Sequence, residues 1–304
     1  MTPFRENVRG IVAITACNVL FLFNDTLIRL TSEREHLPLS EILLIRGLLA
    51  SAVLAPIVLA TGAGKRVALV RSWPLFWRTA AEVFAAFLYL FALFHMPIAN
   101  LNAILQVVPL LLTGAAALFL GERVGWRRWA AIAVGFAGVL VVIRPGFGGF
   151  DAYALVALAA MFFITLRDFC TRLIPSGLPA LVIALVTSAA VGLSGPLLGL
   201  VLQDAWIMPS GMALAMIVGA VFFAIGGYLS AVAFMRHGDI AVVAPFRYSV
   251  IVAAILVGYL VWGDVPDWPM LAGTAIIISA GIYTLYRERN ASMLAAEAAA
   301  GEGL

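Results

Sequence analysis

Charged side chains are scarce in this chain. Of its 304 residues, 12% are Asp, Glu, Lys or Arg and 63% are hydrophobic, and the mean hydropathy is +1.06. A soluble domain carries about 25% charged residues, so no single water-facing core could hold this much apolar surface. The composition therefore predicts an integral membrane protein whose outer side chains face lipid.

The residues that common cofactor and catalytic sites require are also missing. The two cysteines, Cys17 and Cys170, lie inside apolar runs and do not suggest a disulfide framework. The string TGAGKR around Lys65 lacks the glycine spacing and the Ser or Thr of a phosphate-binding loop. No HExxH, DDxxD, G-x-S-x-G or channel-filter motif is present. The sequence thus predicts a protein that is not an enzyme and holds no cofactor or metal.

Ten apolar stretches, each near the roughly 20 residues that a bilayer requires, divide the chain. They lack the alternation of a β-barrel, so we expect an all-α fold of ten transmembrane helices. The predicted spans are residues 9–30, 39–61, 74–96, 98–120, 127–144, 152–174, 179–202, 210–235, 240–262 and 268–287.

The second half of the chain repeats marks of the first at an offset of about 142 residues. The matched marks are Asp25…Arg29 with Asp168…Arg172, Leu37-Pro38 with Leu178-Pro179, His95 with His237, Gly121-Glu122 with Gly263-Asp264, and Trp126 with Trp268. Such a duplication of a multi-helix membrane unit is typical of secondary transporters. We expect a first repeat at residues 1–146, a second at 147–289 and a tail at 290–304.

Lysine and arginine are concentrated in alternate loops, which predicts that both termini are cytoplasmic. The basic loops carry Arg5, Arg9, Lys65, Arg66, Arg71, Arg123, Arg127, Arg128, Arg172, Arg236, Arg287 and Arg289. Because each repeat has five spans, an odd number, the second repeat enters the membrane inverted relative to the first. The net charge of +3 lies in these short clusters, so no nucleic-acid partner is expected.

Several ionisable residues lie within the spans, where each costs roughly 2.5–3.5 kcal/mol if it faces lipid. Arg46, Glu82 and Arg247 lie too deep to reach the headgroups easily, so a cavity role is favoured for them. For Arg29, Arg78 and Arg172, extension to the headgroups is the simpler interpretation. The pairs Asp25–Arg29 and Asp168–Arg172 share a helix face. They are interpreted either as ion pairs at helix ends or as an outer and an inner gate.

Two prolines, Pro109 and Pro245, lie inside spans 98–120 and 240–262 and predict kinks there. Residues 244–248, APFRY, combine such a kink with a cation and a phenol. Glu82 is the first candidate for proton coupling, since desolvation favours its protonated form. The predicted substrate-binding residues are Arg46, Asn102, Gln106, Tyr228, Phe246, Arg247 and Tyr248.

Three segments resemble a known family. Residues 120–146, LGERVGWRRWAAIAVGFAGVLVVIRPG, are similar to the segment that closes the first repeat of the EamA branch of the drug/metabolite transporter superfamily. The segment beginning WGDVPDWPML is similar to the one that closes the second repeat, and LPLSEILLIRG places Arg46 where that family carries an arginine. The resemblance implies ten helices, cytoplasmic termini and an inverted repeat around a central cavity.

The expected function is secondary-active transport of a small organic metabolite across the inner membrane by alternating access, with protons as a candidate coupling ion. Amino-acid-like, nucleoside-like and vitamin substrates such as riboflavin are the candidate classes. The direction of transport and the oligomeric state stay open, a monomer included. The alternatives are an intramembrane enzyme acting on lipid or prenyl substrates and a non-transporting scaffold. An enzyme of that kind needs carboxylates or histidines clustered at one membrane face, whereas these charges are spread over both halves.

Overall fold

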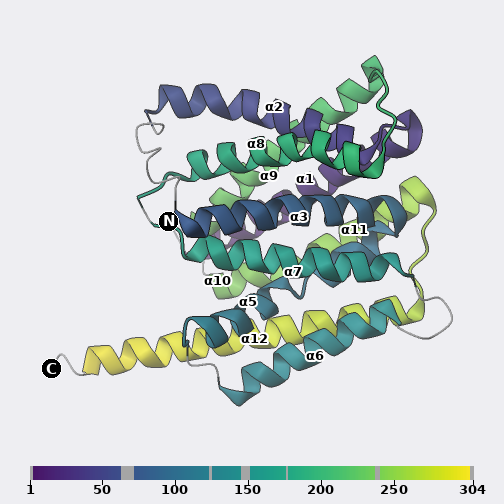
Figure 1. Ribbon diagram of the computed structural model, residues 1–304. Coiled ribbons are helices and arrows are strands. Elements are labelled where there is room, and N and C mark those ends of the chain that lie inside the picture. Colours follow the sequence, from purple (N-terminus) through teal and green to yellow (C-terminus); the bar gives the residue numbers. More distant parts are fainter. Residues whose placement is uncertain are drawn as a thin grey trace. The chain divides into compact units, whose positions relative to one another are not determined.

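The all-α prediction is confirmed by the computed structural model (Figure 1), which describes residues 3–62, 72–122, 125–144, 151–175, 177–236 and 240–301. The helices of the first half are α1 Pro3–Glu35, α2 Leu39–Ala60, α3 Trp73–His95, α4 Ile98–Leu105, α5 Val108–Phe119 and α6 Trp126–Ile143. Those of the second half are α7 Tyr153–Arg172, α8 Ala180–Leu202, α9 Gly211–Arg236, α10 Ile240–Val243, the 3₁₀ helix η2 Ala244–Tyr248, α11 Ser249–Trp262 and α12 Trp268–Gly301.

Ten segments of the described chain are long and apolar enough to cross a membrane, as the sequence predicts. Their bounds agree with the predicted spans to within a few residues, except at the two ends of the chain. There α1 begins at Pro3, and α12 continues through the predicted tail to Gly301. The basic residues Lys65, Arg66, Arg71 and Arg123, and the repeat mark His237, lie outside the described residues.

Two of the ten spans are broken, and these are the two in which proline predicts a kink. α4 ends at Leu105 and α5 begins at Val108, one residue before Pro109. α10 ends at Val243, and η2 holds Pro245 before α11 begins. Proline has no N–H to donate to the preceding turn, and its ring excludes that turn's carbonyl. The predicted kinks are therefore confirmed as interruptions of the helix.

The repeated sequence marks recur as repeated helix ends. Gly121 and Gly263 both have positive φ, 69° and 73°, which glycine adopts without steric cost. The residue after each glycine donates its N–H six residues back, from Glu122 to Ala116 O and from Asp264 to Gly258 O, so both helix ends close with the same hydrogen bond. The structure thus repeats locally at the offset of 142.

Helix starts repeat in the same way. Pro38 and Pro179 each have extended backbone and precede a helix, and the carbonyl of each accepts the N–H groups of the third and fourth residues of that helix. Trp126 and Trp268 are the first residues of α6 and α12. These matches support the predicted duplication, while the inversion of the second repeat stays a prediction.

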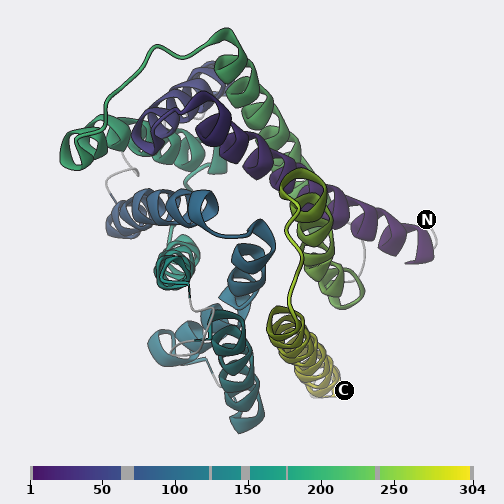
Figure 2. The ribbon, with the colours of Figure 1, turned by 90° about the vertical axis from the view of Figure 1, so that its right-hand side faces the viewer.

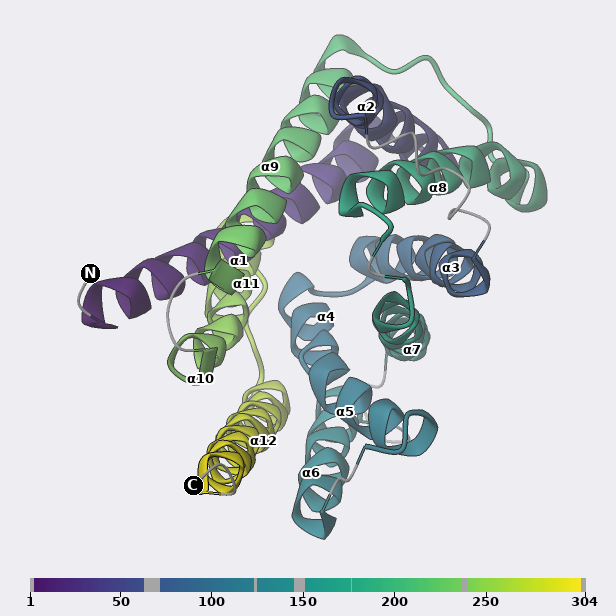
Figure 3. The ribbon, with the colours of Figure 1, turned by 90° about the vertical axis from the view of Figure 1, so that its left-hand side faces the viewer.

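The chain divides into two compact units, and each contains segments of both predicted repeats. Unit 1 comprises Met1–Leu20, Ile98–Phe150 and Gly226–Leu304, and unit 2 comprises Phe21–Pro97 and Asp151–Ile225. In unit 1, α6 packs along α12 (Figure 2), and α4 packs against α11. In unit 2, α2 packs along α8 and α3 along α7 (Figure 3).

Glycines allow the helix pair of unit 2 to approach closely. A methyl group on Gly47 of α2 would lie 2.3 Å from the Cα of Gly192 on α8, which is closer than two carbons can pack. One on Gly195 would lie 2.4 Å from the carbonyl oxygen of Ser40. Small residues that bring backbones together are a common means of helix association in membranes, where the surrounding lipid is as apolar as the helices.

Replacing Gly47 by alanine therefore tests the contact between α2 and α8. We expect Gly47→Ala to lower the free energy of unfolding by about 1–3 kcal/mol, as overpacking does, because the obstructing atoms are backbone. The measurement is the thermal unfolding midpoint of the purified protein in detergent. Gly211→Ala is the control, since a methyl group at Gly211 meets no atom within 4 Å. Equal midpoints for the two variants would contradict the prediction.

Candidate functional site

The predicted site residues fall into two sets, one in each unit. Unit 2 holds Asp25, Arg29, Arg46, Glu82, Asp168 and Arg172. Unit 1 holds Asn102, Gln106, Tyr228, Phe246, Arg247 and Tyr248. Each set is described within its own unit.

Asp25 on α1 is the centre of a buried polar cluster in unit 2. Its side chain is 8% exposed, and its two carboxylate oxygens accept hydrogen bonds from the Tyr89 hydroxyl of α3 and from the Asn24 amide, the latter at 2.8 Å. The Arg46 guanidinium of α2 lies close enough to interact electrostatically with both Asp25 and Tyr89. Three helices thus place an acid, a phenol and a cation together. We call these four residues the Asp25 cluster.

The Asp25 cluster holds polar atoms that are free for a ligand. The Asn24 amide oxygen is buried and has no hydrogen-bond partner among the described residues. Arg46 forms no hydrogen bond or ion pair with another described residue, although its guanidinium carries five donors. A buried donor or acceptor without a partner costs about 1–3 kcal/mol, so a polar group entering this cluster would gain that free energy.

Arg29 does not extend to a headgroup. It is 9% exposed, its Nε pairs with Glu33 at 2.7 Å, and its Nη1 donates to the carbonyl of Met96 at 3.0 Å. Met96 is the extended residue that follows α3, so Arg29 joins the end of α1 to the end of α3. The gate role predicted for Asp25 and Arg29 stays a prediction, but the structure gives each side chain its own set of partners.

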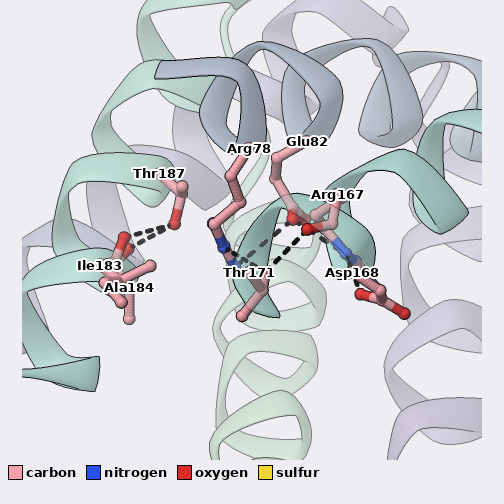
Figure 4. A network of polar contacts seen from close by, with 8 residues as sticks. All are labelled: Arg78, Glu82, Arg167, Asp168, Thr171, Ile183, Ala184 and Thr187. Carbon is pink, nitrogen blue, oxygen red and sulfur yellow. Dashed lines mark hydrogen bonds and ion pairs between the residues drawn. The ribbon is translucent and has the colours of Figure 1, made fainter. Parts of the chain in front are cut away.

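A second network in unit 2 joins α3 to α7 (Figure 4). The Glu82 carboxylate lies 3.4 Å from Arg167 Nη1 and 3.8 Å from Arg78 Nη2. Arg167 Nε also donates to Asp168 at 2.8 Å, and Arg78 Nε donates to Thr171 Oγ1 at 3.1 Å. Glu82 and Asp168 therefore belong to one ion-pair network, which we call the Glu82 network. Arg172 is exposed at the end of α7.

The unit 1 residues lie at or near the two helix breaks, except for Tyr228 on α9. Asn102 is buried, and its amide donates to its own helix at Ile98 O, 2.9 Å away. Gln106 lies in the turn between α4 and α5, is 7% exposed, and its Oε1 has no partner among the described residues. Phe246 and Arg247 are exposed on η2, and Tyr228 is exposed on α9. The Tyr248 hydroxyl packs against Gly281 of α12, in space that any Cβ there would fill.

Asn18 of α1 holds the second helix break in place, which the sequence did not reveal. Its amide donates to Arg247 O at 2.9 Å, to Phe246 O at 3.4 Å and to Ser249 Oγ at 3.2 Å. Tyr89 and Arg167 were likewise absent from the predicted site. A signal existed for Tyr89, because a hydroxyl within an apolar run requires a partner when it is buried.

No metal centre is present in the described chain. No three His, Cys, Asp or Glu side chains come together there in a way that could hold a metal ion. The polar clusters consist instead of guanidinium, carboxylate, amide and hydroxyl groups. Such groups bind polar or charged organic solutes through hydrogen bonds and ion pairs.

An ion pair outside the spans joins the ends of two helices in unit 1. Arg144, directly after α6, donates to the Asp267 carboxylate, which also accepts the N–H of Met270 at 3.0 Å. The hydrogen bond from Arg144 holds the pKa of Asp267 below its usual range. The pair stabilises the folded state while Asp267 is ionised.

A double-mutant cycle tests the Glu82 network. We expect Glu82→Gln and Arg167→Gln each to lower the unfolding free energy, because each leaves an opposite charge without its neighbour. The double variant is expected to lose about 1 kcal/mol less than the sum, since coupled groups are not additive. The measurement is the unfolding midpoint in detergent for all four proteins. If the loss in the double variant equals the sum of the two single losses, Glu82 and Arg167 are not coupled and the network is contradicted.

A pH titration tests the Arg144–Asp267 pair. Because the pKa of Asp267 is lowered in the folded state, its stabilising effect is complete above the unfolded pKa of about 3.9 and is lost as the pH falls through the folded pKa. The Asp267 side chain is about half exposed, so solvent screening limits the effect of Asp267→Asn to below about 1 kcal/mol.

The unfolding midpoints of wild type and Asp267→Asn are expected to differ by a constant amount from pH 7 to pH 5 and to begin to converge as the pH falls below about 3.9. The charge swap Arg144→Asp with Asp267→Arg is the control. Arg144 has a φ of 54°, which aspartate tolerates, so the swap is expected to recover part of the stability. A difference that does not shrink between pH 5 and pH 3 would contradict the assignment.

The first half of the chain matches a known family. Residues 8–144 match the model of the EamA-like transporter family. The chain is also similar to a solved crystal structure at 21% identity and a TM-score of 0.61, with 92% of this chain and 98% of that chain covered, which shows a shared fold.

Relatives with assigned roles match between 64% and 89% of the chain. An S-adenosylmethionine uptake transporter of Rickettsia felis is 25% identical, covering 88% of this chain and 89% of that protein. A riboflavin transporter of Vibrio cholerae is 26% identical, covering 89% and 91%. A pseudopaline exporter of Pseudomonas aeruginosa is 26% identical, covering 64% and 68%. With ten helices in its described part that are long and apolar enough to cross a membrane, the chain is a multi-pass membrane protein, and residues 8–144 carry the match to the EamA-like transporter family.

Proposed function

We propose that the protein is a secondary-active transporter that moves a small organic metabolite across the inner membrane by alternating access, with both termini in the cytoplasm. The observation that carries the proposal is the Asp25 cluster. It places a carboxylate, a phenol and a guanidinium with unused donors inside a bundle of apolar helices. Placing such groups in a membrane is costly, and ionisable residues there commonly mark a substrate or ion pathway. A scaffold has no need of them, and the relatives are named as transporters.

Arg46 is the residue we assign to an anionic or strongly polar group of the substrate. It presents a planar set of donors that can bind a carboxylate or phosphate through two parallel hydrogen bonds. Within the described chain these donors carry no hydrogen bond. The roles of the relatives suggest a panel of amino acids, nucleosides, S-adenosylmethionine and riboflavin as candidate substrates.

In unit 1 we assign substrate contacts to Gln106 and Arg247. Gln106 presents a buried amide oxygen without a partner at a helix break, and Arg247 is exposed on η2. Asn102, Tyr228 and Phe246 stay candidates for further contacts. Tyr248 fits a positioning role better, because its hydroxyl lies against Gly281 of α12 and fixes η2 there.

The proposed coupling carboxylate is Asp25 rather than Glu82. Glu82 has two guanidinium groups within 4 Å, so adding a proton to it would weaken an ion pair with each of two cations, Arg78 and Arg167. Asp25 accepts both of its hydrogen bonds from neutral donors, Tyr89 and Asn24, and has one cation, Arg46, nearby. Protonation of Asp25 would therefore disturb fewer ionic contacts. It would also release Arg46 to bind a substrate anion.

Transport into proteoliposomes tests both assignments. The purified protein is reconstituted, and uptake of each solute in the panel is measured in both directions, with and without an imposed pH gradient. We expect Arg46→Gln to reduce uptake about tenfold or more, because a hydrogen bond to a charged group is worth about 1.5–3 kcal/mol. Asp25→Asn is expected to abolish the response to the gradient, whereas Glu82→Gln keeps it.

The control is Glu122→Gln, which removes an exposed carboxylate after α5 and is expected to transport like wild type. If Glu82→Gln loses the response and Asp25→Asn keeps it, coupling belongs to Glu82. If wild type moves none of the solutes in either direction, transport of these classes is excluded.

A further inference from the structure

A groove lies between α6 and α12 of unit 1, away from the polar clusters. Its volume is about 370 Å³. Trp126, Arg127 and Val134 line it from α6, Ser279 and Tyr283 line it from α12, and three alanines form the rest of its wall. The proposed transport function uses none of these residues.

The groove results from how the two helices pack. A methyl group on Gly138 of α6 would lie 2.9 Å from the carbonyl of Gly273 on α12, so the backbones are nearly in contact there. Towards the start of α6 the facing residues are alanines, which fill little space between the helices. The groove therefore lies on the side of this contact where α6 begins, and its walls are apolar along Val134 and the alanines.

Polar and aromatic groups gather at the start of α6. The Arg127 guanidinium lies 5.5 Å from the centre of the Trp126 ring, a cation–π arrangement. Trp126 is 74% exposed, and Tyr283 supplies a second ring with a hydroxyl. Tryptophan and tyrosine prefer the level of the lipid headgroups. None of the residues that line the groove is acidic.

More positive charge flanks the groove. Arg128 follows Arg127 on α6, and Arg287 lies one helical turn beyond Tyr283 on α12. The walls of the groove are thus apolar along most of its length, and its end at the start of α6 carries aromatic rings and positive charge. An anionic phospholipid matches this arrangement, because its acyl chains are apolar and its headgroup carries a negative phosphate. Basic pockets between transmembrane helices are suited to such headgroups.

The duplicated chain offers an internal comparison. At the offset of 142, Trp126 corresponds to Trp268, the exposed first residue of α12. Arg127 and Arg128 correspond to Pro269 and Met270, which carry no charge. The nearby cation at that end, Arg144, is already paired with Asp267. The two ends therefore share the tryptophan and differ in available positive charge.

We propose that the groove between α6 and α12 binds an anionic phospholipid, with an acyl chain along Val134 and the alanines and the phosphate at Arg127. The positive-inside prediction places this end of α6 at the cytoplasmic surface. The lipid stands alongside the helix pair as a structural ligand and is not the transported solute.

The test uses the full chain in detergent with defined lipids. Dioleoyl-phosphatidylglycerol or dioleoyl-phosphatidylcholine is titrated in, and bound lipid is counted by native mass spectrometry, with the unfolding midpoint as a second measurement. We expect tighter binding of the phosphatidylglycerol to wild type. Loss of one cation near a membrane surface is worth about 1 kcal/mol, so Arg127→Gln is expected to weaken that binding about fivefold.

Two further variants separate charge from shape. Ala130→Leu fills the groove without changing its charge and is expected to reduce retention of both lipids. Trp268→Leu changes the matched tryptophan at the end where the cation is paired with Asp267, and it is expected to leave the preference for phosphatidylglycerol unchanged. Equal binding of the two lipids to wild type, or an unchanged preference in Arg127→Gln, would overturn the proposal.

Discussion

A charge placed among lipid-embedded helices needs a partner within the protein, and this constraint organises unit 2. Asp25 is enclosed by donors from α1 and α3, and Arg29 is held by Glu33 and by a backbone carbonyl. In the Glu82 network, carboxylates and guanidiniums of α3 and α7 neutralise one another. The helix contacts of this unit are therefore partly polar, which gives the helices a defined rotation about their axes that apolar contacts alone would not specify.

The same constraint acts on the backbone in unit 1. A carbonyl that loses its helical partner at a proline must find another donor, or it remains unsatisfied in an apolar environment. At the second break, the Asn18 amide donates to the carbonyls of Phe246 and Arg247, which follow Pro245 in η2. Near the break between α4 and α5 the polar side chain is Gln106, whose oxygen is itself without a partner in the described chain. Interrupted helices of this kind offer polar backbone and side-chain groups for ligands at membrane depth.

The fold was largely predictable because long apolar runs, charges and prolines mark membrane spans directly. The ten spans, the two interruptions and the repeated helix ends all follow from the sequence. The extensions of α1 and α12 were missed, since hydropathy marks the part of a helix that crosses lipid and not where the helix ends.

The site was predictable only in part. Spacing along one helix identifies residues on a shared face, such as Asp25 and Arg29, but it cannot identify partners on other helices. Tyr89 is 64 residues from Asp25 in the chain, and Arg167 is 85 residues from Glu82. These contacts depend on the packing of α3 against its neighbours, which a single sequence does not encode as a local pattern.

The predicted duplication, compared with the helix ends, separates residues that build helices from residues available for chemistry. Both copies need the same helix ends, so Pro38 and Pro179, and Gly121 and Gly263, have matching geometry. A ligand, in contrast, needs a given polar contact from only one of the two repeats. At the offset of 141, Arg46 corresponds to Thr187, whose hydroxyl donates to carbonyls of its own helix at 2.7 and 3.1 Å. The Thr187 hydroxyl thus has its hydrogen-bond partners within its own helix, whereas the Arg46 guanidinium forms no hydrogen bond within the described chain. This difference supports our proposal that Arg46 contacts the substrate.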